Sequence, residues 1–397
     1  MWLENRCESF VGEWNRLHQR RRRMWPLGIV VVLLLGGWAC GSEDPTGPIP
    51  EPGRVKRVPA DYPTIQAALD AAEGEDSVLV APGHYYGSGN TRLRFHGRWV
   101  SLIAESGPES TFIECRDTLG AAPVALYPQD GETSATEVQG FTIRRSGWKY
   151  DRSPLVLCEQ SGPTFRNCRF VGDGSTLLRI SHAGPSFRDC TISGERLDIG
   201  GGLIEIYEGT PRFLGTTISE NYGARGSVLR CEKSYLELMH CQITGNGGAG
   251  VVRLINSAGT LEYCLIAKNA TVEGYTGGIS VEGRSSFGIG GCTIADNFSY
   301  TGAGITVVGG ASVFLGRCIL WGNCAEMHAA VRVEPWSHAS LQDCAVDTSQ
   351  VGGPGTVVYR GGIREDDPRF CRPAGCLSGE TGDYRVRDDS PYRYSPY

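Results

Sequence analysis

A repeat near the middle of the chain constrains its folding more than any other feature. Nine segments share an apolar residue, then a central residue three positions later, then a second apolar residue two positions after that. The central residues are Phe141, Cys168, Cys190, Thr216, Cys241, Cys264, Cys292, Cys318 and Cys344, and their spacing clusters near 25 residues. Such self-similarity indicates an array of stacked structural units.

Two apolar columns flank the central residues without exception. Three positions before each centre stand Val138, Phe165, Phe187, Phe213, Leu238, Leu261, Ile289, Leu315 and Leu341, and two positions after it stand Ile143, Phe170, Ile192, Ile218, Ile243, Ile266, Ile294, Leu320 and Val346. This spacing predicts coils of short strands whose alternate side chains face a shared core. Each strand pairs with its equivalent one coil later, so about ten coils at roughly 4.8 Å each make a rod on the order of 50 Å long.

A second strand is predicted before each centre, with inward pairs such as Val156 and Cys158 or Leu229 and Cys231. Its outward positions hold Arg179, Glu205, Arg230, Arg253 and Arg332, beside Glu159, Tyr207, Glu232, Glu282 and Glu334. One interpretation is a solvated ladder of ion pairs. The other is a sugar-binding groove, in which arginine binds carboxylates or sulfates, glutamate acts as acid or base, and Tyr207 stacks on a ring.

The candidate substrate-binding residues are therefore Arg179, Glu205, Tyr207, Arg230, Glu232 and Arg253. Residues just before the centres are also predicted to point outward, on the same or an adjacent face. They include Asp189, His240, Tyr263, Arg317 and Asp343.

Two polar columns are predicted to be structural. Five positions after successive centres stand Asn221, Asn246, Asn269, Asn297 and Asn323, which can form a hydrogen-bonded ladder and tolerate a left-handed corner. The column cysteines are predicted to be buried free thiols, because parallel strands suit disulfides poorly. Cys371 and Cys376 lie outside the column and are the predicted disulfide pair. No metal site is expected, since the histidines do not pair with cysteines at zinc spacing.

Composition and charge narrow the function classes. The chain has 55 glycines and four methionines, which favours short strands and tight turns over long helices. Its net charge is −6, and residues 1–39 carry six arginines against three glutamates, so the remainder carries −9. An acidic surface repels phosphate backbones, so nucleic acid is not an expected partner.

The first 57 residues predict export. Four arginines at 20–23 precede the apolar run Leu27 to Ala39, which is too short to span a membrane. Gly37-Trp38-Ala39-Cys40 resembles the lipobox of bacterial lipoproteins, which implies a signal peptide at 1–39 and lipidation of Cys40. A flexible tether at 40–57 would then hold the protein on a membrane, facing the periplasm or cell surface. Cleavage without lipidation would instead make it a secreted protein.

Both ends of the repeat resemble a known family. "VPADYPTIQAALDAAEGEDSVLVAPGHYYG", Val58 to Gly87, predicts a capping helix from Thr64 to Ala72, a strand from Ser77 to Ala81 and a Pro-Gly turn. It resembles the opening of right-handed parallel β-helix repeat proteins of the pectin-lyase-like superfamily, and the likeness covers about residues 58–370. The resemblance implies an all-β solenoid, with the cap and first coil at 58–90 and the β-helix at 91–365.

The segment Asp366 to Tyr392, "DDPRFCRPAGCLSGETGDYRVRDDSPY", resembles the terminal element that closes the last coil in many secreted bacterial β-helix proteins. Residues 366–397 are therefore expected to be a closing segment.

The superfamily includes pectate lyases, polygalacturonases and pectin methylesterases, so cleavage of an acidic polysaccharide is one hypothesis. Lyases of this kind need calcium and a basic residue, and hydrolases need facing carboxylates. The blocks that carry the catalytic aspartates and arginine of methylesterases have no counterpart here, and no paired-aspartate motif appears. The leading hypothesis is therefore a non-catalytic, surface-anchored protein, without cofactor, that presents an elongated face to a glycan or cell-envelope partner. The alternatives are a polysaccharide lyase or glycoside hydrolase, and a structural spacer.

Overall fold

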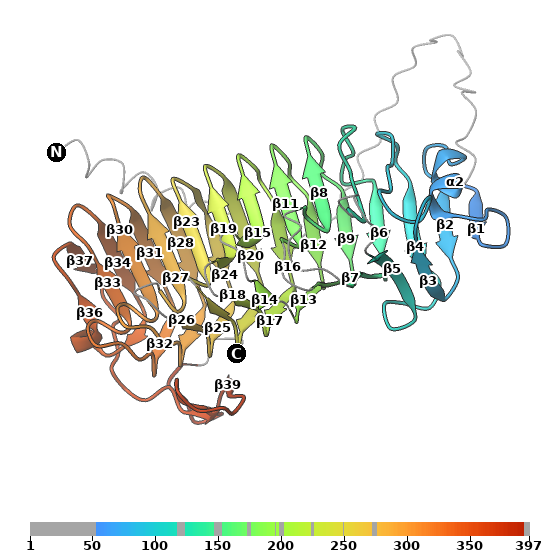
Figure 1. The fold of residues 1–397 in the computed structure, drawn as a ribbon. Coiled ribbons are helices and arrows are strands. Elements are labelled where there is room, and N and C mark those ends of the chain that lie inside the picture. Colours follow the sequence, from blue (N-terminus) through green and yellow to red (C-terminus); the bar gives the residue numbers. More distant parts are fainter. Residues whose placement is uncertain are drawn as a thin grey trace, which may run out of the picture. The chain divides into compact units, whose positions relative to one another are not determined.

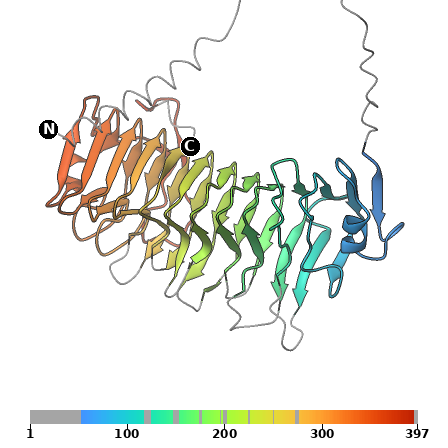
Figure 2. The same ribbon diagram turned by 90° about the horizontal axis from the view of Figure 1, so that it is seen from above.

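The structure is a computed structural model that describes residues 53–116, 124–146, 153–172, 176–194, 196–197, 202–223, 226–248, 250–271 and 276–392. Its strands stack along one axis into long parallel sheets (Figure 1, Figure 2). Each complete coil contributes one strand to each of three sheets, and each strand pairs with its equivalents in the neighbouring coils. The predicted right-handed parallel β-helix is confirmed as the fold.

Sheet 1 has 13 strands. They are β1 (Val55–Val58), β2 (Ser77–Val80), β4 (Ser101–Ala104), β6 (Glu137–Gln139), β9 (Thr164–Arg166), β12 (Ser186–Arg188), β16 (Arg212–Leu214), β20 (Tyr235–Met239), β24 (Ala258–Glu262), β28 (Ser286–Gly290), β31 (Ser312–Gly316), β34 (His338–Gln342) and β37 (Thr356–Tyr359). The strands from β6 to β34 carry the column that precedes each repeat centre.

Sheet 2 has 11 strands and carries the column that follows each centre. They are β3 (Gly83–Tyr86), β5 (Thr111–Arg116), β7 (Thr142–Ser146), β10 (Arg169–Val171), β13 (Thr191–Ser193), β17 (Thr217–Ser219), β21 (Gln242–Thr244), β25 (Leu265–Ala267), β29 (Thr293–Ala295), β32 (Ile319–Trp321) and β35 (Ala345–Val346).

Sheet 3 has nine strands and corresponds to the predicted second strand. They are β8 (Val156–Glu159), β11 (Leu178–Ser181), β15 (Gly202–Tyr207), β19 (Ser227–Glu232), β23 (Val252–Ile255), β27 (Ile279–Glu282), β30 (Ile305–Val308), β33 (Val331–Val333) and β36 (Val351–Gly352). A small fourth sheet has four strands, and its last three follow asparagines of the asparagine column. It comprises β14 (Arg196–Leu197), β18 (Tyr222–Gly223), β22 (Gly247–Gly248) and β26 (Ala270–Thr271).

The capping helix is shorter than predicted, and the cap as a whole begins earlier in the chain. Helix α2 runs only from Ile65 to Asp70, with Thr64 as N-cap, and packs against β1 and β2. Strand β1 starts at Val55, inside the stretch assigned to the tether, and pairs with β2. The only other helix of the described residues is the three-residue turn η1 (Thr348–Gln350). No helix in this part of the chain is long and apolar enough to cross a membrane. Cys40 and the predicted leader lie outside the described residues.

Like stacks on like inside the coils. The rings of Phe165, Phe187 and Phe213 lie parallel on successive strands of sheet 1, with centroids 5.0 and 4.8 Å apart. The column cysteines are buried free thiols. Cys168, for example, donates from Sγ to the carbonyl of Val138 at 3.4 Å, and burial raises its pKa to about 12. Thr216 replaces cysteine in one coil and its hydroxyl makes the equivalent bond, so the column selects a small donor rather than a reactive thiol.

The residues immediately before the repeat centres lie at the corner between sheets 1 and 2, and their backbone conformation explains their mixed chemistry. Each adopts a left-handed conformation, with φ from 48° to 79°. They are Gly140, Asn167, Asp189, Gly215, His240, Tyr263, Gly291, Arg317 and Asp343. These side chains therefore stand at a bend, away from the outer face of sheet 3, and their mixed chemistry reflects a backbone requirement with few side-chain constraints.

The asparagine column forms a continuous ladder. Asn246 Oδ1 accepts from both the backbone N–H and Nδ2 of Asn221, at 3.1 and 3.0 Å, and the same bonds repeat up to Asn323. The left-handed residue of this corner is the one before each asparagine, such as Lys268 or Asp296, and this corrects the expectation for the asparagines themselves. A shorter serine ladder, not predicted, joins Ser234, Ser257 and Ser285 at the corner between sheets 3 and 1.

The closing segment lies on the side of the solenoid. After β37 the chain folds back, and the antiparallel hairpin of β38 (Phe370–Arg372) and β39 (Asp383–Val386) covers the outer face of sheet 2 (Figure 1). Phe370, Tyr384 and Tyr392 pack there. The sheet residues that they contact are Leu265, Ala267, Ala295, Ile319 and Ala345. The predicted closing segment therefore shields an apolar strip along the later coils.

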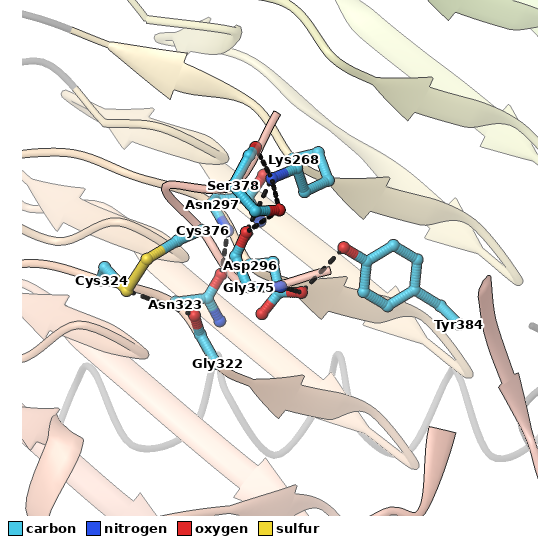
Figure 3. The surroundings of a disulfide bond; sticks show 10 residues. All are labelled: Lys268, Asp296, Asn297, Gly322, Asn323, Cys324, Gly375, Cys376, Ser378 and Tyr384. Carbon is cyan, nitrogen blue, oxygen red and sulfur yellow. Dashed lines mark hydrogen bonds between the residues drawn. A yellow bond between two sulfur atoms is a disulfide. The ribbon is translucent and has the colours of Figure 1, made fainter. Parts of the chain in front are cut away.

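A disulfide fixes this segment, but its partners differ from the prediction. Cys376 is bonded to Cys324, 52 residues earlier, and Cys371 is exposed and free (Figure 3). The predicted Cys371–Cys376 pair was wrong because the fold-back brings Cys376 against the loop that follows Asn323. Beside it, Asp296 Oδ2 accepts from Tyr384 Oη at 2.9 Å and from the Gly375 N–H at 2.7 Å, and Lys268 Nζ donates to the Gly375 carbonyl at 2.6 Å.

Candidate functional site

The six predicted binding residues all lie on the outer face of sheet 3. Register aligns Arg179, Glu205, Arg230 and Arg253 on β11, β15, β19 and β23, while Tyr207 and Glu232 align in the neighbouring column. With three residues of the later coils they form what we call the Arg–Glu face. Its members are Arg179, Glu205, Tyr207, Arg230, Glu232, Arg253, Glu282, Arg332 and Glu334.

Each arginine of the Arg–Glu face is engaged by a glutamate. Arg179 bonds Glu205 at 3.0 Å, and Arg230 bonds Glu232 at 3.0 Å. Arg253 forms a two-pronged pair with Glu282 at 2.6 and 2.9 Å, and Arg332 bonds Glu334 at 2.6 Å. The pairs are partly exposed, so each contributes only a few tenths of a kcal/mol to stability. The face is consequently an ion-pair ladder with close to no net charge.

Tyr207 belongs to a corner that sequence reasoning missed. Its hydroxyl accepts from Lys233 Nζ at 3.0 Å, and His182 stands edge-on to its ring at a centroid distance of 6.0 Å. Glu208 in turn lies 3.3 Å from His182 and 3.8 Å from Lys233. His182, Glu208 and Lys233 all have φ of 49°, so their spacing follows the bend after each strand of sheet 3. Lys233 Nζ also lies over the Tyr207 ring, 5.1 Å from its centroid, and Tyr207 as a whole residue is 39% exposed.

The carboxylates of sheet 3 are all engaged. Glu159, which lies beside the Arg–Glu face, accepts from Tyr127 Oη at 3.2 Å, and the four glutamates of the face bond arginines. Among the described residues, no group of three or more His, Cys, Asp or Glu is placed to hold a metal ion. The geometry offers paired donors and acceptors, without two carboxylates facing each other across a cleft.

A second polar site lies on the outer face of sheet 2, in the first coils. The Glu114 cluster consists of His84 on β3, Glu114 and Arg116 on β5, and Arg144 on β7. Glu114 is 1% exposed. Three side chains bond its carboxylate. His84 Nδ1 lies 2.9 Å from Glu114 Oε1, Arg116 Nε donates to Glu114 Oε2 at 2.8 Å, and Arg144 Nε donates to Glu114 Oε1 at 2.6 Å.

Aromatic rings hold the cations of this cluster in place. Phe112 stacks on His84 at 4.6 Å and lies 4.7 Å from the Arg144 guanidinium, while Arg116 lies 3.7 Å above the Tyr86 ring. Burial alone would raise the pKa of Glu114, but the bonds from His84, Arg116 and Arg144 lower it to about 2. Sequence reasoning missed this cluster because His84, Glu114 and Arg116 precede the first repeat centre, and only Arg144 lies in a repeat coil. Their β-strand register could have signalled it only after the strands were aligned.

Comparisons with known proteins concern the fold. Among solved structures, the chain is similar to the catalytic unit of a GH87 alpha-1,3-glucanase from Streptomyces thermodiastaticus, at 12% identity and a TM-score of 0.44, covering 76% of this chain and 65% of that one. Pectate lyase Pel9A matches at 13% identity, 82% and 84% coverage and a TM-score of 0.44. Carrot pectin methylesterase matches at 11% identity, 80% and 87% coverage and a TM-score of 0.34.

These likenesses say nothing about activity, because the identities are low and the TM-scores fall below 0.5. The chain also spans less than two thirds of the glucanase unit. No curated protein matches the sequence. The family described as the right handed beta helix region matches residues 131–271 and 223–346, which together make up more than half of the chain. Together with the stacked parallel sheets, this match shows that the chain belongs to the right-handed β-helix family.

Proposed function

We propose that this protein is a non-catalytic glycan-binding rod, exported and anchored to a membrane through lipid on Cys40, and that the Arg–Glu face is its binding surface. The observation that carries the proposal is the recurrence of partly exposed arginine–glutamate pairs on successive coils. The leader, the Gly37 to Cys40 motif and the Pro-rich stretch after it support the anchoring.

Paired charges suit hydroxyl-rich ligands. A guanidinium has five N–H donors and a carboxylate about four acceptor sites, so a pair such as Arg230 and Glu232 retains donors and acceptors for a ligand. Mutual pairing fixes these groups before binding and lowers the entropy lost on association. Because the charges cancel, the face favours the hydroxyls of a neutral or weakly charged glycan over a polyanion.

The repeat also matches the ligand class. Equivalent side chains recur at roughly 4.8 Å, the distance between neighbouring strands. A linear glycan presents equivalent hydroxyls at regular intervals, so several units can contact several coils at once. Multiple weak contacts along a rod then add up to useful affinity. Tyr207, which is 39% exposed, offers a partly accessible aromatic ring on which one sugar could pack.

A catalytic role fits the Arg–Glu face less well. Glycoside hydrolysis needs two carboxylates on opposite sides of the scissile bond, one of them protonated. Here Glu205, Glu232, Glu282 and Glu334 lie on one flat face, each bonded to an arginine. Such glutamates are poorly placed to act as an acid and base pair.

The test is a binding and turnover screen. The purified chain is incubated with neutral and acidic polysaccharides, with and without calcium, and both bound polymer and new reducing or unsaturated ends are recorded. We expect binding without new ends, and weaker binding after combined Arg230→Ala and Arg253→Ala substitution. New ends would make the protein an enzyme, while neither binding nor turnover would favour a spacer. Replacing Cys40 by Ser should move the protein from the membrane to the soluble fraction.

A further inference from the structure

The Glu114 cluster differs from the Arg–Glu face in its charge balance. On the Arg–Glu face, arginines and glutamates pair one to one. In the cluster, two arginines and one histidine share a single carboxylate. The cluster therefore keeps an excess of at least one positive charge, even with His84 neutral, on a protein whose net charge is −6.

The cations cover the carboxylate and face solvent. The Glu114 side chain is 2% exposed, whereas those of His84, Arg116 and Arg144 are 50, 46 and 37% exposed. Arg116 and Arg144 each bond Glu114 through Nε and one terminal nitrogen, and Arg116 also shares a side-chain hydrogen bond with Tyr86. A guanidinium has five N–H groups, so each of these partly exposed arginines keeps N–H donors that Glu114 does not use. His84 likewise uses Nδ1 on Glu114 and leaves Nε2 on the exposed side.

The arrangement is rigid, and one arginine would have been enough for a structural role. Either guanidinium could satisfy the buried carboxylate in a two-pronged pair. Instead, two arginines from adjacent strands and a histidine from a third strand converge, each held by a ring of Tyr86 or Phe112. Holding like charges together has an electrostatic cost that a purely structural pair would avoid. A bound anion would relieve this repulsion.

We propose that His84, Arg116 and Arg144 form a binding site for a sugar-borne oxyanion, the carboxylate of a uronic acid or the sulfate ester of a sulfated sugar. The N–H donors that Glu114 does not use supply charge-assisted hydrogen bonds to the oxygens of the anion, and Glu114 positions the donors from beneath. The site goes beyond the function proposed above, because it lies on sheet 2 in the first coils and selects negative charge, while the Arg–Glu face is on sheet 3 and close to neutral.

Calorimetric titration of the purified full chain tests the site with three tetrasaccharides of equal length: an oligogalacturonate, a κ-carrageenan fragment that carries sulfate esters and no uronic acid, and neutral maltotetraose. We expect the anionic probes to bind at low salt and to weaken as salt rises, with Arg144→Ala reducing affinity about tenfold. Arg169→Ala is the matched control, since Arg169 lies on the next strand of sheet 2, paired with the exposed Glu109, and it should leave binding unchanged. The preferred probe distinguishes carboxylate from sulfate.

A measurement on the wild-type chain guards against misfolded variants. Phenylglyoxal modifies accessible arginines, and mass spectrometry reports each position. The bound anionic probe should slow modification of Arg116 and Arg144 several-fold while Arg169 reacts as before. Equal protection of all three, or anionic probes that bind no better than maltotetraose, would overturn the proposal. Loss of neutral-glycan binding in the Arg230 and Arg253 variant concerns only the Arg–Glu face, so the two proposals fail separately.

Discussion

Sheet 2 presents two different outer faces along one continuous stack. In its first strands this face carries the Glu114 cluster, whose cations His84, Arg116 and Arg144 are partly exposed. In its last strands the outward side chains, such as Leu265, Ala295 and Ile319, are buried beneath the closing segment. The inward column is the same in both parts, because Ile143 and Ile294 occupy equivalent buried positions.

This difference shows that the repeat constrains the identity of the inward side chains and leaves that of the outward side chains free to vary. Inward residues must fill a shared core, so every coil restricts them in the same way. Outward residues depend only on what lies outside the coil, which is solvent in the first coils and the chain's own C-terminal hairpin in the later ones. Each prediction below changes one side of this contrast, in order of decreasing expected effect.

Removing an aromatic anchor of the closing segment should have the largest effect. Phe370 is 6% exposed and packs on the last strands of sheet 2, so Phe370→Ala should lower the free energy of unfolding of this segment by about 3–5 kcal/mol. Limited proteolysis should then cut between residues 366 and 392. Phe112→Ala, on the uncovered part of the same sheet, serves as the control and should leave the segment protected.

Cys376→Ser should weaken the same contact by removing the bond to Cys324, at a cost of about 2–4 kcal/mol. Hydrogen exchange of β38 and β39 reports the loss of protection. Cys371→Ser is the matched control, because Cys371 is exposed and free. If Cys371→Ser loosened the hairpin as much as Cys376→Ser, the disulfide assignment would be refuted.

Glu114→Gln should destabilise the first coils by about 2–3 kcal/mol at neutral pH. The folded pKa of Glu114, about 2, lies below the unfolded value of roughly 4.3, so this stabilisation is present above pH 5 and is lost as pH falls toward 2. Urea unfolding at several pH values should show a smaller acid-induced loss in the variant. Glu109→Gln, at the exposed pair with Arg169, should match the wild type within about 0.5 kcal/mol.

Arg332→Gln should have the smallest effect, a few tenths of a kcal/mol, because its pair with Glu334 is partly exposed on the Arg–Glu face. Thermal melting in low and high salt measures it. A loss above about 1 kcal/mol would mean that this face contributes substantially to the fold, and it would weaken the argument that its pairs are maintained for binding.

Sequence alone identified the coil, its core columns and the outward column of sheet 3, because a strand alternates its side chains and a repeat aligns equivalent positions. The strand with Arg179, Glu205 and Arg230 could be placed for the same reason. The sequence prediction placed the left-handed backbone of the ladder corner at the asparagines, but the structure places it at the residue before each of them. The ladder bonds, such as that from Asn221 to Asn246, form without a left-handed asparagine.

Only the tertiary structure decided which surfaces meet. Cys376 bonds Cys324 because the chain folds back over sheet 2. No local sequence pattern predicts the direction in which the chain turns after β37. His84, Glu114 and Arg144 are each 30 residues apart in sequence, and His84 and Glu114 precede the first repeat centre, so only the register of β3, β5 and β7 brings the three together. Periodicity determines which way a side chain points, whereas its partner across the outer surface depends on where other segments come to lie.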